Sequence, residues 1–199
     1  MLMKRNFLFF IVVFYTFTLQ AQTGKYKNQI EVSSCILVND IVRFSKVEEG
    51  MTVKNGEGFR IGLTFDRRLN QKLFVVTGFN YLQTSNPFDG NNTAPDDPSQ
   101  KSMILQFPLG MRYTVKDWLY FKSGISIDSQ FNNKEGEILD NQSGIGFFLN
   151  GGIHLSINNR LHYNIEPGFN FTSLIPFKKD DHHQHFFLSG INFNIGYTF

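Results

Sequence analysis

The 199-residue sequence has one cysteine, no apolar run of 20 residues and little net charge. The single Cys35 cannot form an internal disulfide. A membrane-spanning helix needs about 20 apolar residues, so the sequence predicts none. Its 19 basic residues nearly balance its 17 acidic residues. This balance removes the electrostatic basis for binding nucleic acid, and we expect no nucleic-acid partner.

The first 21 residues have the pattern of a secretory signal. Lys4 and Arg5 precede an apolar run at 7–17, and the small residue Ala21 stands at the expected cleavage position. The alternative is an N-terminal membrane anchor, for which the run is short. We therefore expect a cleaved signal peptide at 1–21 and one domain at 22–199. Without Lys4 and Arg5, this domain has 17 basic and 17 acidic residues.

Residues 186–199 alternate between bulky apolar side chains and Gly, Asn, Ser or Thr, and the chain ends on Phe199. A period of two indicates a β-strand whose two faces meet different environments. This segment resembles the last strand of Gram-negative outer-membrane β-barrels. The resemblance implies that Phe193, Ile195, Tyr197 and Phe199 form a C-terminal assembly signal for the barrel-assembly machinery.

Eight segments alternate in this way, at 29–39, 58–67, 72–83, 104–113, 118–130, 145–156, 161–172 and 186–199. Short turns at 68–71, 115–117 and 158–160 separate longer connections at 40–57, 84–101, 131–143 and 174–184. Outer-membrane barrels have short periplasmic turns and longer outer loops. The order predicts an all-β fold, an eight-stranded antiparallel up-and-down transmembrane β-barrel with N- and C-termini in the periplasm.

The segment Ile104–Tyr113 reads Ile-Leu-Gln-Phe-Pro-Leu-Gly-Met-Arg-Tyr. It resembles the L-x-I-P-L strand of the small outer-membrane barrel family that includes the PorT-like proteins, with Phe107 where that pattern has isoleucine. The resemblance implies an eight-stranded barrel domain of the OmpA or OmpX type, located in the outer membrane. It also implies a role in assembling or supporting a secretion apparatus.

If the apolar faces meet lipid, the charged side chains of the opposite faces enter the barrel lumen. Eight strands enclose a space that side chains can fill, and an unpaired buried charge costs several kcal/mol. We therefore expect a structural polar network in the lumen, with Asp128 and His162 also directed inward. Its expected members are Arg60, Asp66, Arg112, Lys122, His154 and Glu166.

These features favour a non-enzymatic integral outer-membrane protein that presents four extracellular loops. Its role would be envelope structure, adhesion, partner recognition or support of a secretion apparatus. The expected partners are outer-membrane lipid, the barrel-assembly machinery during biogenesis, and a surface or secretion-system protein. We expect no cofactor, no metal and no catalytic residues.

Two alternatives belong to other classes. A soluble periplasmic lipocalin-like barrel that binds an apolar ligand would reverse the pattern, with the bulky faces inside. An outer-membrane lipid-modifying enzyme could use His154 and Ser156, but this pair would then have to face lipid. Weaker candidates for metal binding are the histidine-rich loop at 178–185 and the acidic loop at 87–99.

Overall fold

Antiparallel strands make up most of the chain that the structure describes. The structure is a computed structural model, and the described residues are 28–43, 52–53, 55–89, 99–132, 139–178 and 184–199. The strands are β1 (Asn28–Arg43), β2 (Thr52–Val53), β3 (Gly56–Arg68), β4 (Leu73–Asp89), β5 (Ser99–Lys116), β6 (Leu119–Gln130), β7 (Gly144–Ser156), β8 (Leu161–Pro176) and β9 (Gln184–Thr198). Within these ranges, no helix is long and apolar enough to cross a membrane.

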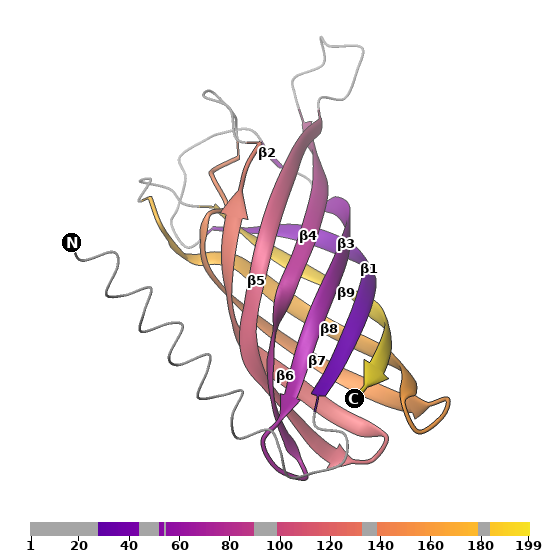
Figure 1. The fold of residues 1–199 in the computed structure, drawn as a ribbon. Helices are drawn as coiled ribbons and strands as arrows, with labels where there is room; N and C mark the ends of the chain where they lie inside the picture. Colours follow the sequence, from indigo (N-terminus) through magenta and orange to yellow (C-terminus); the bar gives the residue numbers. More distant parts are fainter. Residues whose placement is uncertain (1–27, 44–51, 54, 90–98, 133–138, 179–183) are drawn as a thin grey trace, which may run out of the picture.

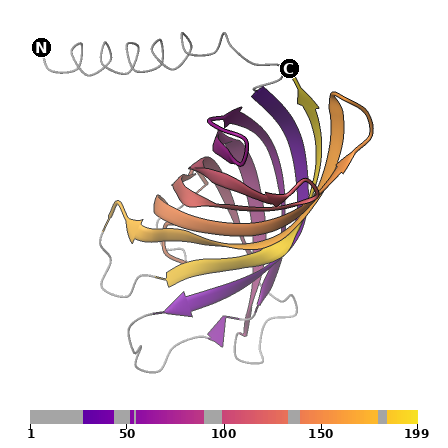
Figure 2. The same ribbon diagram turned by 90° about the horizontal axis from the view of Figure 1, so that it is seen from below.

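Eight of these strands close into a barrel (Figures 1 and 2). From β3 to β9 each strand pairs with the next along the chain, and β1 pairs with both β3 and β9. All of these pairings are antiparallel. The two-residue strand β2 pairs with the end of β4, opposite Phe88 and Asp89. The predicted eight-stranded antiparallel barrel is confirmed.

The two ends of the barrel differ. At one end, here called the turn end, short connections join β3 to β4, β5 to β6 and β7 to β8. Asn70 and Asn158 tighten two of these turns, because each side-chain oxygen accepts two backbone N–H groups at 2.8–2.9 Å. Asn28 and Phe199 also pair there through two backbone hydrogen bonds. The opposite, loop end carries β2 (Figure 1).

Several strands continue further toward the loop end than the alternation predicted. The prediction ended the first strand at residue 39 and placed 84–101 in a connection, whereas β1 reaches Arg43, β4 reaches Asp89 and β5 begins at Ser99. The backbone ladder persists there, with Asn86 opposite Gln100. Backbone hydrogen bonds do not depend on side-chain polarity. A pattern based on polarity therefore loses the strand where both of its faces become polar.

The outer face of the barrel is apolar along all eight strands. On β1, Val32 is 62% exposed and Ile36 is 78% exposed, whereas Glu31 and Cys35 on the other face are buried. Exposed side chains continue the belt around the barrel, among them Ile61, Phe79, Leu109, Phe121, Ile153 and Ile195. A continuous apolar surface of this extent is typical of a face that meets a membrane or a partner.

Candidate functional site

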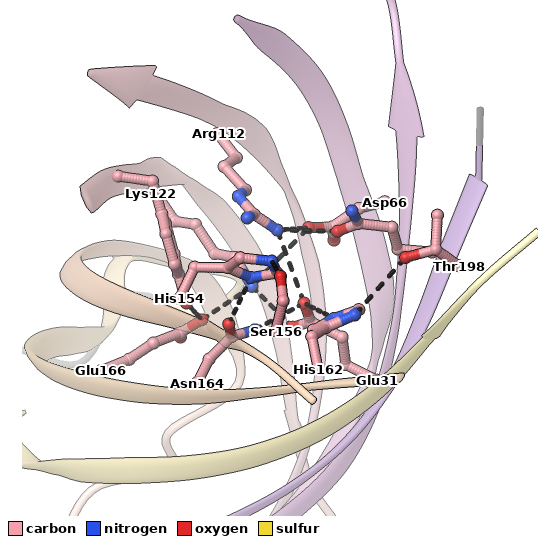
Figure 3. A network of polar contacts seen from close by, with 12 residues as sticks. Glu31, Asp66, Arg112, Lys122, His154, Ser156, His162, Asn164, Glu166 and Thr198 are labelled. Atoms are coloured by element: carbon pink, nitrogen blue, oxygen red, sulfur yellow. Dashed lines mark hydrogen bonds and ion pairs between the residues drawn. The ribbon is translucent and has the colours of Figure 1, made fainter. Parts of the chain in front are cut away.

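A cluster of five charged side chains occupies the turn-end half of the lumen (Figure 3). Five different strands contribute to it, and each side chain is at most 5% exposed. The members of this charged cluster are Glu31, Asp66, Arg112, Lys122 and Glu166. The inward face of each strand brings its residue into the interior, so residues up to 135 positions apart become neighbours.

Lys122 lies at the centre of the charged cluster. Its Nζ is 2.8 Å from Glu31 Oε2, 2.8 Å from Glu166 Oε1 and 3.7 Å from Asp66 Oδ2. One ammonium group therefore faces three carboxylates from three strands. At such depth, the pairing offsets a desolvation cost of several kcal/mol per ion. The arrangement is stable only when all partners are present.

Arg112 is the second cation of the cluster. Its Nη1 lies 3.3 Å from Asp66 Oδ2 and 3.5 Å from Glu31 Oε1, and it donates to Gln29 Oε1 at 2.8 Å. The guanidinium also lies 4.0 Å from the centre of the Tyr120 ring. The face of an aromatic ring attracts a cation. Tyr120 in turn donates its hydroxyl hydrogen to Glu166, which joins the ring to the ion pairs.

A chain of hydrogen bonds leads from Glu31 to the rim of the turn end. Asn164 Nδ2 donates to Glu31 Oε1 at 2.9 Å, so Asn164 Oδ1 faces His154 Nδ1, 2.8 Å away. A carboxylate only accepts, which assigns the Asn164 amide and makes His154 Nδ1 the donor. His154 Nε2 then accepts from the Ser156 hydroxyl at 3.3 Å. His162 Nε2 donates to Glu31 at 3.2 Å.

The Ser156, His154 and Asn164 chain has the order of groups that activate a hydroxyl nucleophile. Its place does not suit the alternative of a lipid-modifying enzyme, which would require this pair to face lipid. His154 and Asn164 lie on the lumen side of β7 and β8 (Figure 3), whereas their neighbours Leu155 and Ile153 face outward. The chain therefore belongs to the polar filling of the lumen, and its exposed end, Ser156, is at the turn-end rim.

Arg60, another predicted member of the network, lies apart from the charged cluster. Its Nη2 donates to Asn192 Oδ1 at 2.8 Å, nearer the middle of the barrel. Ion pairs thus connect Asp66, Arg112, Lys122 and Glu166. His154 joins this network through Asn164, whereas Arg60 has a hydrogen bond to the amide of Asn192. The structural role predicted for all six residues stays a prediction.

The loop-end half of the lumen contains a cluster of apolar side chains, with buried polar side chains such as Asn39, Thr84 and Asn86 beside it. This apolar cluster consists of Cys35, Leu37, Leu82, Ile104, Leu139, Phe186 and Leu188, all at most 3% exposed. Leu139 belongs to residues 139–143, the connecting segment just before β7, so these residues enter the barrel mouth. Cys35, the single cysteine, packs within this cluster.

Gln142 fixes the same connecting segment across the mouth. Its backbone N–H donates to Gln130 Oε1 at 2.8 Å, and its Nε2 donates to the Gln184 carbonyl at 2.7 Å. Its Oε1 accepts from Thr172 Oγ1 at 2.7 Å and from the Phe186 N–H at 3.2 Å. One glutamine therefore ties the segment to β6, β8 and β9.

Asp128 is buried near this mouth, and its carboxylate accepts hydrogen bonds from uncharged groups. Gln106 Nε2 donates to Asp128 Oδ1 at 2.9 Å, and the backbone N–H of Ser173 donates to Asp128 Oδ2 at 3.1 Å. Ser173 has φ of 49°, and the β7 and β8 registers shift between Ile145 and Phe147. This bulge turns the Ser173 N–H toward the carboxylate, as bulges commonly re-aim a group.

Sequence reasoning missed Glu31, although it has contacts with both cations of the charged cluster. The alternation of the first strand is poor because Cys35 and Leu37 are apolar inward residues. The outward side chains Val32 and Ile36 would have been the signal, because they place Glu31 on the inward face of the strand. Sequence reasoning also missed Asn164 as the link to His154, since a cross-strand contact depends on the β7–β8 register.

The predicted C-terminal assembly residues all point outward from β9 and the chain end. Phe193, Ile195, Tyr197 and Phe199 are 37–60% exposed. Tyr197 and Phe199 stack with ring centres 6.3 Å apart, and Arg160 Nη1 donates to the Tyr197 hydroxyl at 2.9 Å. These residues form part of the apolar belt at the turn end. Their role in assembly stays a prediction.

Metal binding has no support in the described part of the chain, where no group of three His, Cys, Asp or Glu side chains could hold an ion. The predicted histidine-rich loop has residues 179–183 outside the described residues, and the acidic loop has 90–98 outside them. The predicted signal peptide at 1–21 also lies outside them.

Comparison with known proteins rests on structure, because no family model and no curated protein matches this sequence. The outer-membrane protein OprG from Pseudomonas aeruginosa is similar over 89% of this chain and 98% of its own, with a TM-score of 0.57 and 13% identity. The outer-membrane protein AlkL, determined in lipid bilayers, is similar over 90% of this chain and 94% of its own, with a TM-score of 0.53 and 10% identity.

The chain has the fold of small outer-membrane β-barrels. This likeness covers nearly the full described barrel and nearly the full length of both solved proteins. At 10–13% identity it concerns the fold alone. The finer resemblance to PorT-like proteins, drawn from Ile104–Tyr113, has no support from these comparisons.

Proposed function

We propose that this protein is a non-conducting, non-enzymatic barrel of an outer membrane that anchors and displays its loop-end segments. The observation that carries the proposal is the filled lumen. The charged cluster blocks the turn-end half, and the apolar cluster with Leu139 blocks the loop-end half. A barrel whose interior is packed at two levels supplies a rigid wall and no open path for solutes.

The membrane location is supported by the outer face. The apolar belt would be costly in water, because about 25 cal/mol is lost for each Å² of apolar surface left exposed. The alternative of a soluble lipocalin-like barrel requires the bulky faces inside, yet Ile36, Val32 and Ile195 are at least 60% exposed. The inward faces of the turn-end half carry the charges instead. Lipid around the barrel fits the apolar outer face, while the closed lumen keeps the charged inward faces away from lipid.

The proposed orientation puts the turn end, with Asn28 and Phe199, in the periplasm and the loop end outside. Short turns on the periplasmic side and longer outer connections are the usual arrangement of such barrels. The secretory signal predicted at 1–21 and the aromatic residues predicted to act as an assembly signal support export and insertion by the barrel-assembly machinery. The displayed segments would then meet a surface or secretion-system protein, as the resemblance to PorT-like proteins implies.

Conductance measurements test whether the lumen is closed to ions. The purified protein is reconstituted into planar lipid bilayers, and its folding is checked by the difference in gel mobility between unheated and boiled samples. We expect a heat-dependent shift and no current steps. A double variant, Lys122→Ser with Leu139→Ser, serves as the control in which both blocks are weakened. Regular current steps from the folded wild-type protein would refute the proposal.

Orientation is tested separately with single cysteines in a Cys35→Ser background. Lys101→Cys lies at the loop end and Asn159→Cys lies in a turn-end connection, and both wild-type side chains are exposed. A membrane-impermeant maleimide applied to intact cells should label the first and not the second. Labelling in the opposite pattern would show that the turn end faces outward.

A further inference from the structure

The rim of the turn end carries an excess of positive charge, opposite to the longer connections. The short connections and the residues beside them, at 67–72, 115–118 and 157–160, hold five basic side chains and one acidic side chain, Asp117. Even with the terminal carboxylate of Phe199, positive charge prevails there. The longer connections at 40–57, 84–101, 131–143 and 174–184 hold seven basic and twelve acidic residues. The cations of the turn-end rim are Arg67, Arg68, Lys72, Lys116 and Arg160.

Three of these rim cations have no carboxylate within ion-pair distance in the part of the chain that the structure describes. The ion pairs found in that part all lie in the lumen. Lys72 and Lys116 are exposed, and Arg67 is half-buried. Arg68 differs, because its guanidinium donates to two backbone carbonyls of its own turn. The lumen thus pairs its own charges, whereas the rim presents positive charge to an anion outside the barrel.

The rim cations lie where the apolar belt ends. Arg67 continues the outward face of β3 at its turn-end limit. Lys116 Nζ is 5.6 Å from the centre of the Trp118 ring, and Arg160 Nη1 donates to the Tyr197 hydroxyl at 2.9 Å. Trp and Tyr concentrate at the headgroup level of membranes. Cations beside these rings therefore lie at the depth of the lipid phosphates.

The distribution of the rim cations favours a layer of anions over a single compact anion. The cations come from three turns, which join β3 to β4, β5 to β6 and β7 to β8, so they are spread along the rim. A compact anion would contact one turn, whereas a layer of headgroups meets all three. Each Lys or Arg near an anionic membrane surface strengthens the attraction about fivefold.

We propose that the turn-end rim binds the anionic headgroups of phospholipids in the leaflet on its side of the membrane. This proposal rests on the membrane location proposed above. Phosphatidylglycerol has a net negative charge, whereas the choline of phosphatidylcholine neutralises its own phosphate. The ammonium groups of Lys72 and Lys116 and the guanidinium of Arg67 donate to phosphate oxygens, and such charge-assisted hydrogen bonds are the stronger ones. The barrel therefore surrounds its turn end with acidic lipid.

Spin-labelled lipids test the proposal directly. The protein is reconstituted into phosphatidylcholine vesicles at low salt, and its folding is checked by the heat-dependent shift in gel mobility. Electron paramagnetic resonance then measures how much spin-labelled phosphatidylglycerol or phosphatidylcholine the barrel immobilises. We expect a preference of about two- to threefold for phosphatidylglycerol. It should disappear in about 1 M NaCl, where the Debye length is about 3 Å.

Two double variants with the same change in charge locate the binding. Lys72→Gln with Lys116→Gln removes two exposed cations from the turn end, and Lys101→Gln with Lys178→Gln removes two from the loop end. The first variant should lose most of the preference, and the second should keep it. Equal losses, or a folded wild-type barrel without preference, would overturn the proposal in favour of a soluble acidic partner. A wild-type protein that does not insert would refute the membrane location, and this proposal with it.

Discussion

The two halves of the lumen are blocked by opposite chemistry. In the turn-end half, five charged side chains form a network of ion pairs, and in the loop-end half seven apolar side chains pack together beside buried polar groups. The charged half requires complete pairing, since one missing partner leaves a buried charge. The apolar half has no such requirement and loses only contact area and packing. One barrel interior can therefore be packed by directional ion pairs in one half and by non-directional apolar contacts in the other.

The two clusters also differ in how their side chains are anchored to the backbone. Each side chain of the charged cluster is held by a strand, and strand register sets ion-pair distances closely. In the apolar cluster, six side chains are also held by strands, whereas Leu139 comes from a connecting segment. Apolar contacts tolerate small displacements, so a segment without strand pairing can complete the packing. Hydrogen bonds of Gln142 then hold this segment in place.

The largest expected effect is at the centre of the charged half. Lys122→Met leaves Glu31 and Glu166 without their 2.8 Å contacts. We expect a loss of about 3–5 kcal/mol in the free energy of unfolding, because buried carboxylates lose their counter-ion. Urea unfolding in lipid vesicles measures it. Lys116→Met, at an exposed residue over Trp118, is the control, and equal losses in both would show that the ion pairs contribute nothing.

In the apolar half, the loss in the free energy of unfolding should depend on the size of the cavity that a truncated side chain leaves. Leu82→Ala removes a fully buried side chain, and we expect a loss of about 2–5 kcal/mol. Leu109 is 56% exposed on the outer face, where lipid can fill the space left by Leu109→Ala. The same unfolding measurement should therefore show a smaller loss for Leu109→Ala. A larger loss at Leu109 would mean that the apolar cluster is loosely packed.

A smaller loss in the free energy of unfolding is expected at Gly152, which lies against Tyr120 beside the charged cluster. A Cβ at Gly152 would collide with the Tyr120 ring, while one at Gly151 would meet Phe121 at 3.3 Å. Gly152→Ala should displace Tyr120 from Arg112 and Glu166, at a cost of about 1–3 kcal/mol. Near-UV circular dichroism and unfolding report the change. If Gly151→Ala is equally destabilising, the Tyr120 contact is not the cause.

The smallest effect is expected at the rim of the charged half. Ser156 is exposed, and its contact is a 3.3 Å hydrogen bond to His154. Ser156→Ala should change the free energy of unfolding by less than about 0.5 kcal/mol. The wild-type protein should release no fatty acid from phospholipid vesicles and should not react with a fluorophosphonate. Labelling that disappears in Ser156→Ala would instead establish a nucleophilic serine.

Particular residues show how far the sequence could predict this molecule. The inward direction of Arg112, Lys122 and Glu166 follows from a period of two, and the structure has all three inside the barrel. The ladder beyond residue 39 in β1 could not be predicted, because polarity stops alternating there while backbone pairing continues. The bulge at Ser173 has no signal in the alternation either, since it depends on the backbone conformation of one serine.

The amino-acid sequence by itself determined the number of strands, their order and which side chains face inward, because these depend on a local period and on turn lengths. The tertiary structure alone decided which inward residues meet. The contact of Lys122 with Glu31 and Glu166, and the entry of Leu139 among Leu82 and Phe186, depend on register and barrel closure. These are relations between distant segments, and a period within one strand contains no information about them.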